Sequence, residues 1–230
     1  TAALFAGFYA IIAAIQGRFE LAGGVIFIAM VLDGLDGRVA RATNTQTAFG
    51  AEYDSLADMV SFGVAPALVV YQWALHDMGK LGWLAAFLYT ACAALRLARF
   101  NTQVGVADKR FFQGLPSPAA AALLAGMVWV GEDLQLPGES SNIIIWVLTV
   151  MAGLLMVSNV RFNSFKDFDP RNRVPFVVML VVVLVFVAIA LSPPQVLFGA
   201  FLIYAFSGPI MTLIYRRQRR ALRQQAREST

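Results

Sequence analysis

The sequence has little charge. Of its 230 residues, 14% are charged and 59% are hydrophobic, and the mean hydropathy is +0.67. An average soluble domain has about 25% charged and about 45–50% apolar residues, so this shortage excludes a soluble globular domain and a disordered chain. A helix needs about 20 mainly apolar residues to cross a bilayer, and several stretches of this chain meet that length. We therefore predict an integral membrane protein.

Cysteine and histidine are equally scarce, with only Cys92 and His76. A single cysteine excludes an intrachain disulfide and a secreted disulfide scaffold. The net charge is +4, from 18 Lys+Arg against 14 Asp+Glu. In a membrane protein, basic loops that fix the orientation explain this excess better than nucleic-acid binding does. Because the chain begins at Thr1 with a short apolar run, and without the features of a signal peptide, we expect further residues upstream.

The apolar runs predict an all-α, polytopic domain that extends over residues 1–230. No linker, low-complexity segment or repeat divides the chain. Polar residues separate eight predicted helices, and we expect about eight transmembrane spans. The helices cover residues 1–16, 20–41, 47–75, 80–100, 116–132, 142–160, 174–191 and 195–217.

The basic residues predict the orientation of these helices. If the helices alternate across the membrane, Arg18 and Lys80 lie on one side and all other Lys and Arg residues lie on the side of the 42–46 turn. By the positive-inside rule, that basic side faces the cytoplasm. Both termini are then cytoplasmic.

Four aspartates interrupt the second and third predicted helices. Asp33 and Asp36 are three residues apart, and Asp54 and Asp58 are four apart, so each pair lies on one face of its helix. The short polar turn at 42–46 joins the two helices as antiparallel neighbours. The four carboxylates should therefore converge near the cytoplasmic surface.

Four carboxylates in a low dielectric repel one another unless cations neutralise them. Oxygen ligands suit Mg²⁺, Mn²⁺ or Ca²⁺, and four acids fit two ions about 4 Å apart, as in phosphoryl displacement. Gly37 and Gly50 leave room for a bulky ligand. Arg41 is placed to pair with phosphate, and Thr47 offers a hydroxyl beside it.

Two other interpretations are salt bridges from the acids to Arg38 and Arg41, and a path for cation transport. Two arginines cannot neutralise four acids. Transport acids usually lie near the bilayer midplane, whereas these acids flank a loop. The pattern therefore favours a two-metal phosphoryl-transfer site.

The spacing D-x2-D-G-x2-A-R-x8-G-x3-D-x3-D, which covers residues 33–58, resembles the signature of the CDP-alcohol phosphatidyltransferases. The resemblance implies a membrane enzyme, expected to be a homodimer, that moves a phosphatidyl group from a CDP-linked lipid to an alcohol. It implies that Asp33 and Asp54 bridge the two metals, that Asp36 completes one site, and that Asp58 binds the second metal and acts as the base. The residues implied to hold the CDP group are Gly37, Arg41, Thr47 and Gly50.

Stretches at 53–66, 94–101 and 112–118 resemble the bacterial inner-membrane branch of this family, whose donor is CDP-diacylglycerol and whose acceptor is L-serine. Serine is a zwitterion, so its pocket needs a cation for the carboxylate. The candidates for that pocket are Arg96, Arg99, Asn101 and Gln113.

Three alternatives remain. Arg96 and Arg99 could instead anchor their helix at the membrane interface. The same arginines would also serve glycerol 3-phosphate, which is the acceptor of the phosphatidylglycerophosphate-forming relatives. A metal-binding transporter without transferase activity is the alternative that is not an enzyme.

Overall fold

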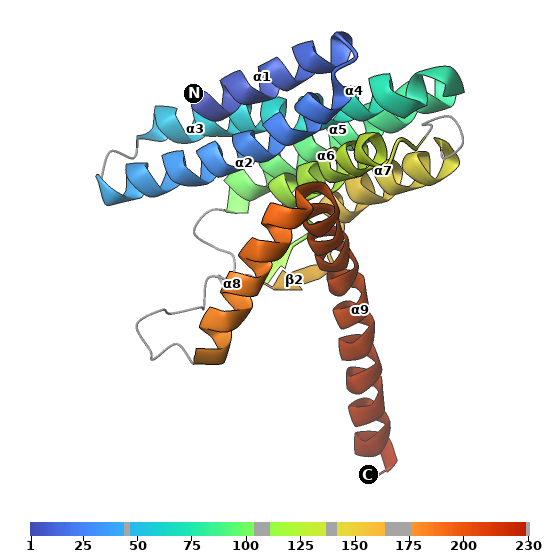
Figure 1. The fold of residues 1–230 in the computed structure, drawn as a ribbon. Coiled ribbons are helices and arrows are strands. Elements are labelled where there is room, and N and C mark those ends of the chain that lie inside the picture. Colours follow the sequence, from blue (N-terminus) through green and yellow to red (C-terminus); the bar gives the residue numbers. More distant parts are fainter. Residues whose placement is uncertain (44–46, 104–110, 137–141, 164–175, 229–230) are drawn as a thin grey trace.

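The structure, a computed structural model, describes residues 1–43, 47–103, 111–136, 142–163 and 176–228. These residues form helices and one pair of short strands (Figure 1). In chain order the elements are α1 (Ala2–Ile15), α2 (Phe19–Ala42), α3 (Ala48–Asp58), the π-helix η1 (Met59–Val64), α4 (Ala65–Val70), the π-helix η2 (Tyr71–Leu75), the 3₁₀-helix η3 (His76–Met78), α5 (Lys80–Gln103), β1 (Phe111–Gln113), α6 (Ser117–Asp133), α7 (Asn142–Val157), β2 (Arg161–Asn163), α8 (Phe176–Leu191) and α9 (Pro193–Glu228).

The segments from α3 to η3 run on as one continuous helix, Ala48–Met78. When they are counted as one, the described residues contain the eight predicted helices. The prediction of an all-α chain needs one correction. β1 and β2 pair antiparallel, with Phe112 opposite Phe162. These strands of three residues each lie in segments that hydropathy assigned to loops or to the edge of a loop, and they are too short to show an alternating pattern.

Three helices among the described residues are long and apolar enough to cross a membrane: Ala48–Met78, Lys80–Thr102 and Pro193–Thr212. Shorter apolar helices cover Ala2–Ile15, Asn142–Val157 and Met179–Leu191. The chain is thus a membrane protein by its helices. The eight spans and the cytoplasmic termini stay predictions.

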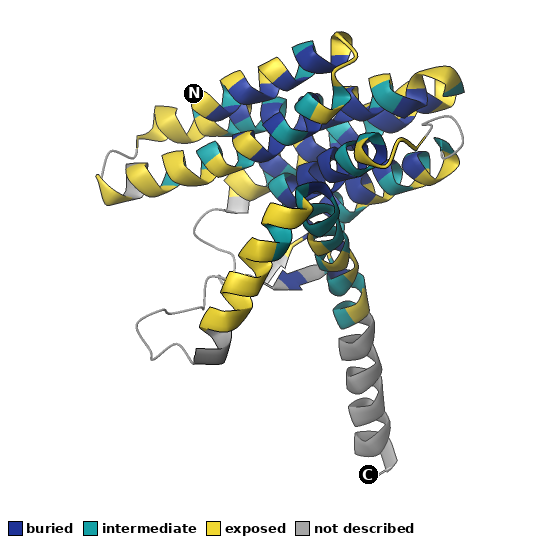
Figure 2. Cartoon of the chain, in the orientation of Figure 1, coloured by how far each residue is buried: buried dark blue, intermediate teal, exposed yellow. Residues whose placement is uncertain are grey.

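Small residues let the helices approach closely around α6, which packs against α2, α4, α7 and α9. The segment from Ala119 to Val128 is buried throughout, and dark blue marks this core in Figure 2. A Cβ atom added to Gly23 of α2 would lie 2.9 Å from the Ala125 carbonyl oxygen. Close backbone approach at small residues is the usual way in which membrane helices pack.

The helix α8 has the opposite character. Its large apolar side chains from Met179 to Val187 are exposed, and α8 and α9 project from the α1–α7 bundle (Figures 1 and 2). A helix that is apolar on every side and uncovered by protein is suited to contact lipid.

The close contact at Gly23 can be tested by Gly23→Ala. We expect this variant to lose about 1–3 kcal/mol of stability, because the added methyl group overpacks the α2–α6 contact. The matched control is Gly199→Ala, where an added Cβ meets nothing within 4 Å. The measurement is the midpoint of thermal unfolding in detergent, and equal midpoints for the two variants would contradict the packing argument.

Candidate active site

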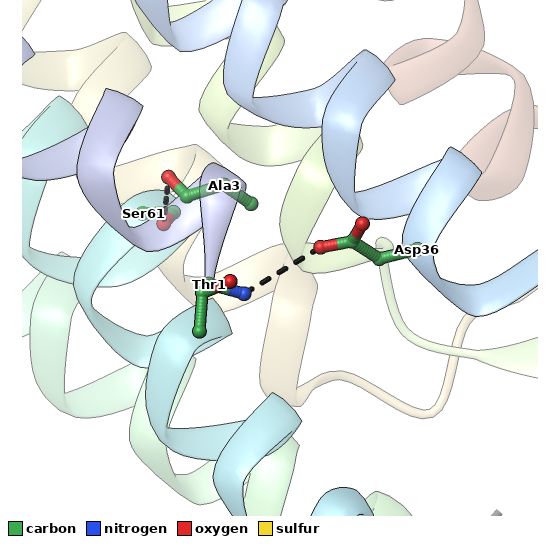
Figure 3. Close-up of polar contacts among 4 residues, drawn as sticks. All are labelled: Thr1, Ala3, Asp36 and Ser61. Atoms are coloured by element: carbon green, nitrogen blue, oxygen red, sulfur yellow. Dashed lines mark hydrogen bonds and ion pairs between the residues drawn. The ribbon is translucent and has the colours of Figure 1, made fainter. Parts of the chain in front are cut away.

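Asp33 and Asp36 lie in the last part of α2. Asp33 is half-buried and Asp36 is exposed, and the charges of the two carboxylates interact. The Thr1 amino nitrogen lies 3.5 Å from Asp36 Oδ2 (Figure 3). α2 therefore presents both acids at the end of the bundle where α1 begins.

Asp54 and Asp58 lie on α3, whose start is fixed by a side-chain cap. Thr47 Oγ1 accepts a hydrogen bond from the Gly50 amide at 3.0 Å, as expected of a threonine before the first turn of a helix. Asp54 is exposed and Asp58 is half-buried at the end of the helix. Thr47 thus has a structural partner at the position that the signature implies for contact with CDP.

The structure brings the aspartates of the two helices together. The carboxyl groups of Asp33 and Asp58 lie within hydrogen-bonding reach of each other, and the charge of Asp54 acts on both. Two carboxylates in contact repel unless a proton or a cation lies between them. The structure thus shows Asp33 and Asp58 close together with the charge of Asp54 acting on both, whereas the convergence of all four carboxylates stays a prediction.

The described acidic side chains are not arranged as a complete ligand set for one metal ion. Within the residues that the structure describes, no three Asp, Glu, His or Cys side chains are placed to hold a single metal. One oxygen of Asp58, Oδ1, is buried and has no hydrogen-bond partner among the described residues. An orphaned carboxylate oxygen of this kind is a position where a ligand or a cation would bind.

The salt-bridge interpretation receives no support from Arg38, which is exposed. In the described part of the chain, the ion pair found for the four aspartates is the one between Asp36 and the Thr1 amine. Arg41 belongs to α2, but its side chain lies outside the described residues.

Arg96 of α5 is close enough to Asp58 for the two charges to interact. Its Nη1 donates a hydrogen bond to Ser117 Oγ at 2.8 Å, at the start of α6. Its Nε is buried and has no hydrogen-bond partner in the part of the chain that the structure describes. The guanidinium is therefore anchored by one nitrogen while another remains able to donate to a ligand.

Arg99 follows the same pattern one turn later. Its Nη2 donates to the Val157 carbonyl oxygen at 3.0 Å, at the last residue of α7, where the helix leaves carbonyls without partners. Its Nη1 is buried, and no described residue accepts a hydrogen bond from it. Both predicted serine-binding arginines thus combine a structural contact with a free donor.

The side chain of Asn101 is engaged with α3. Its Nδ2 donates to Ser55 Oγ at 3.0 Å, and Ser55 Oγ lies 3.2 Å from its Oδ1. Gln113 is exposed on β1. The turn that follows it depends on Gly114, because φ is +79° and an added Cβ would lie 2.2 Å from the Met156 carbonyl oxygen.

Other predicted residues lie at the ends of the two acidic helices. Gly37 is half-buried on α2, and Gly50 is exposed in the first turn of α3. His76 lies at the other end of the Ala48–Met78 helix, where its Nε2 is 3.0 Å from Asp77 Oδ1.

Sequence reasoning missed three residues at the site: Ser55, Ser117 and Tyr204. Ser55 and Ser117 lie inside the resembling stretches, so their positions could have suggested a role. Tyr204 of α9 interacts electrostatically with Arg96, and no motif in the second half of the chain indicates it. α9 therefore contributes a side chain to the surroundings of Arg96.

Comparison with known proteins points to one family. Residues 1–158 match the family described as CDP-alcohol phosphatidyltransferase. The chain is 39% identical over 202 residues to the CDP-diacylglycerol–serine O-phosphatidyltransferase of Helicobacter pylori strain J99, covering 87% of this chain and 84% of that protein. It is 33% identical over 206 residues to the enzyme of the same name from Mycobacterium leprae, covering 86% and 68%. The match to the one from Methanocaldococcus jannaschii is 38% over 143 residues, covering 62% and 64%.

Proposed function

Because the chain belongs to the CDP-alcohol phosphatidyltransferase family, we propose that it transfers the phosphatidyl group of CDP-diacylglycerol to L-serine, giving phosphatidylserine and CMP. The names of its relatives support this pair of substrates. The observation that carries the proposal is that Asp33, Asp54 and Asp58 converge from two helices beside the guanidinium of Arg96. Such a site can receive a diphosphate and an acceptor carboxylate side by side.

We propose that Asp33, Asp36, Asp54 and Asp58 hold two divalent cations, Mg²⁺ or Mn²⁺, with Ca²⁺ as an alternative occupant. The residues fit, since the donors are all carboxylate oxygens and Asp58 Oδ1 is buried without a partner. Asp36 and Asp54 are exposed, so their side chains can turn toward an ion without displacing buried groups. When bound, such cations neutralise a diphosphate and the charge that develops on it.

Asp58 is the proposed base. Its carboxyl group lies close to Asp33, and its buried Oδ1, which has no hydrogen-bond partner among the described residues, can accept a hydrogen bond from an incoming hydroxyl. Asp58 takes the proton from the serine hydroxyl, whose oxygen attacks the phosphorus attached to diacylglycerol as CMP leaves. The fixed positions of the signature contain no Ser, Cys or His. We therefore propose direct displacement without a covalent phosphatidyl-enzyme.

Arg96 and Arg99 are the proposed cations for the serine carboxylate. Each has a buried nitrogen without a partner, and charge-assisted hydrogen bonds are about twice as strong as neutral ones. Asn101 and Gln113 are proposed to border the serine pocket.

Gly37, Arg41, Thr47 and Gly50 are proposed to contact the CDP group at the exposed ends of α2 and α3. The lipid tails of the donor would remain in the bilayer. We also propose a homodimer in a bacterial inner membrane, with the site facing the cytoplasm.

The first test is CMP release by the purified chain with CDP-diacylglycerol and Mn²⁺ or Mg²⁺. We expect release with L-serine and not with glycerol 3-phosphate. Release with glycerol 3-phosphate alone would support a phosphatidylglycerophosphate synthase. If neither acceptor gave release and the protein instead carried cations into liposomes, the transporter interpretation would replace both.

The role of Asp58 is tested by Asp58→Asn, which keeps the size of the side chain and removes its basicity. We expect turnover to fall at least about 100-fold, the usual contribution of a general base. Glu52→Gln is the matched control, because Glu52 is exposed on the same helix and occupies an unspecified position of the signature. Retained turnover in folded Asp58→Asn would exclude Asp58 as the base.

The serine pocket is tested by Arg96→Gln. We expect KM for serine to rise about tenfold or more while KM for CDP-diacylglycerol changes little, because one charge-assisted hydrogen bond contributes about 1.5–3 kcal/mol. Arg38→Gln, an exposed arginine on α2, is the control. An unchanged KM for serine in Arg96→Gln would show that Arg96 does not bind the acceptor.

A further inference from the structure

The helix that carries Asp58 changes its winding directly after that residue. α3 ends at Asp58, and the π-helix η1 covers Met59–Val64. At its end the Ala65 amide donates to the Val60 carbonyl oxygen, five residues back. A π-turn inserts one residue into the helical repeat and is frequent at functional sites. It therefore sets how the face that carries Asp58 is rotated relative to the helix that follows.

Pro66 gives a physical reason for this π-turn. In an uninterrupted α-helix, the amide of residue 66 would donate to the carbonyl of Phe62. Pro66 has no N–H, and its ring clashes with a carbonyl four residues earlier. The wider turn relieves that clash, and the Phe62 carbonyl receives no hydrogen bond from residue 66.

Tyr89 of α5 supplies a side-chain donor to this carbonyl. Its hydroxyl donates to the Phe62 carbonyl oxygen at 3.0 Å, and its side chain is 0% exposed. Phe62 is also fully buried, so no bulk water can replace Tyr89. The next residue back, Ser61, is held in a similar way, because its Oγ donates to the Ala3 carbonyl oxygen at 3.0 Å (Figure 3).

The contacts between α5 and the Asp58 helix run antiparallel and place Asp58 between two hydrogen-bonded points. Asn101 binds Ser55 on one side of Asp58, and Tyr89 binds Phe62 on the other. Arg96, which interacts with Asp58, lies between Asn101 and Tyr89 on α5. The relative position of Asp58 and Arg96 thus depends on how both helices are held.

We propose that Tyr89 is a positioning residue: its hydrogen bond to the Phe62 carbonyl holds the π-turn that directs Asp58 toward Asp33 and Arg96. This inference rests on the proposed function, in which Asp58 is the base. Tyr89 touches no substrate in this scheme. It acts through the backbone that follows Asp58.

The test compares Tyr89→Phe with Thr149→Val in the full chain. Thr149 is also 0% exposed and donates through Oγ1 to a backbone carbonyl, that of Ile145 at 2.8 Å, but on α7. We expect kcat of Tyr89→Phe to fall about tenfold or more, as small displacements of catalytic groups do, with KM for serine within about twofold of the unmodified chain. Thr149→Val should keep its kcat although it too loses a buried hydrogen bond.

Thermal unfolding and hydrogen exchange of the segment 59–66 are measured on the same samples. Faster exchange there together with the selective loss of kcat supports the proposal. A kcat of Tyr89→Phe that is retained, or that falls only as much as that of Thr149→Val, overturns it. Absence of turnover in the unmodified chain would instead refute the proposed function, and the role of Tyr89 with it.

If Tyr89→Phe does not fold, Pro66→Ala tests whether turnover needs the π-turn. This variant returns an N–H at residue 66, which can bind the Phe62 carbonyl in ordinary α-helical geometry. A stable Pro66→Ala protein with lowered kcat supports the need for the π-turn. A stable Pro66→Ala protein with unchanged kcat overturns the proposal that the π-turn positions Asp58.

Discussion

The repulsion between Asp33 and Asp58 is the interaction on which the rest of the site depends. Carboxyl groups within hydrogen-bonding reach of each other separate unless the backbones that carry them are fixed. α2 is fixed by close packing on α1 and α6, and α3 is fixed by the Thr47 cap and by the contacts of α5. The fold therefore holds like charges at positions that a cation would stabilise.

The small residues of the bundle also help to fix the backbones that carry the acids. Gly7 of α1 lies so close to Ser61 that an added Cβ would be 2.6 Å from its Cα. That contact sets α1 against the π-turn next to Asp58. Apolar side chains alone do not hold membrane helices in fixed positions, because the hydrophobic effect does not drive helices together in a bilayer. Shape complementarity and hydrogen bonds must position the acids instead.

The sequence allowed the helices and the acidic pair of helices to be predicted, because hydropathy and residue spacing report on single elements. Asp33 and Asp58 were expected to converge, and they do.

The β1–β2 pair was not expected, since strands of three residues each carry no period. The π-turn was not expected either: its signal is Pro66, which reads equally well as a kink or a helix start. The hydrogen bond from Arg96 to Ser117 and the electrostatic interaction of Arg96 with Tyr204 join distant parts of the chain, and spacing within one helix cannot show such interactions.

The hydrogen-bond partners of Arg96 and Arg99 bear on which acceptor the site can bind. Arg96 and Arg99 are held by neutral oxygens, those of Ser117 and Val157, rather than by carboxylates. Their positive charges are therefore anchored without being neutralised by these partners, and Arg96 is close enough to Asp58 for the two charges to interact. A zwitterion such as serine matches this arrangement, because its carboxylate can face the arginines while its ammonium faces acidic oxygen. A phosphate dianion matches the arginines alone and adds negative charge beside the aspartates, which favours serine on electrostatic grounds.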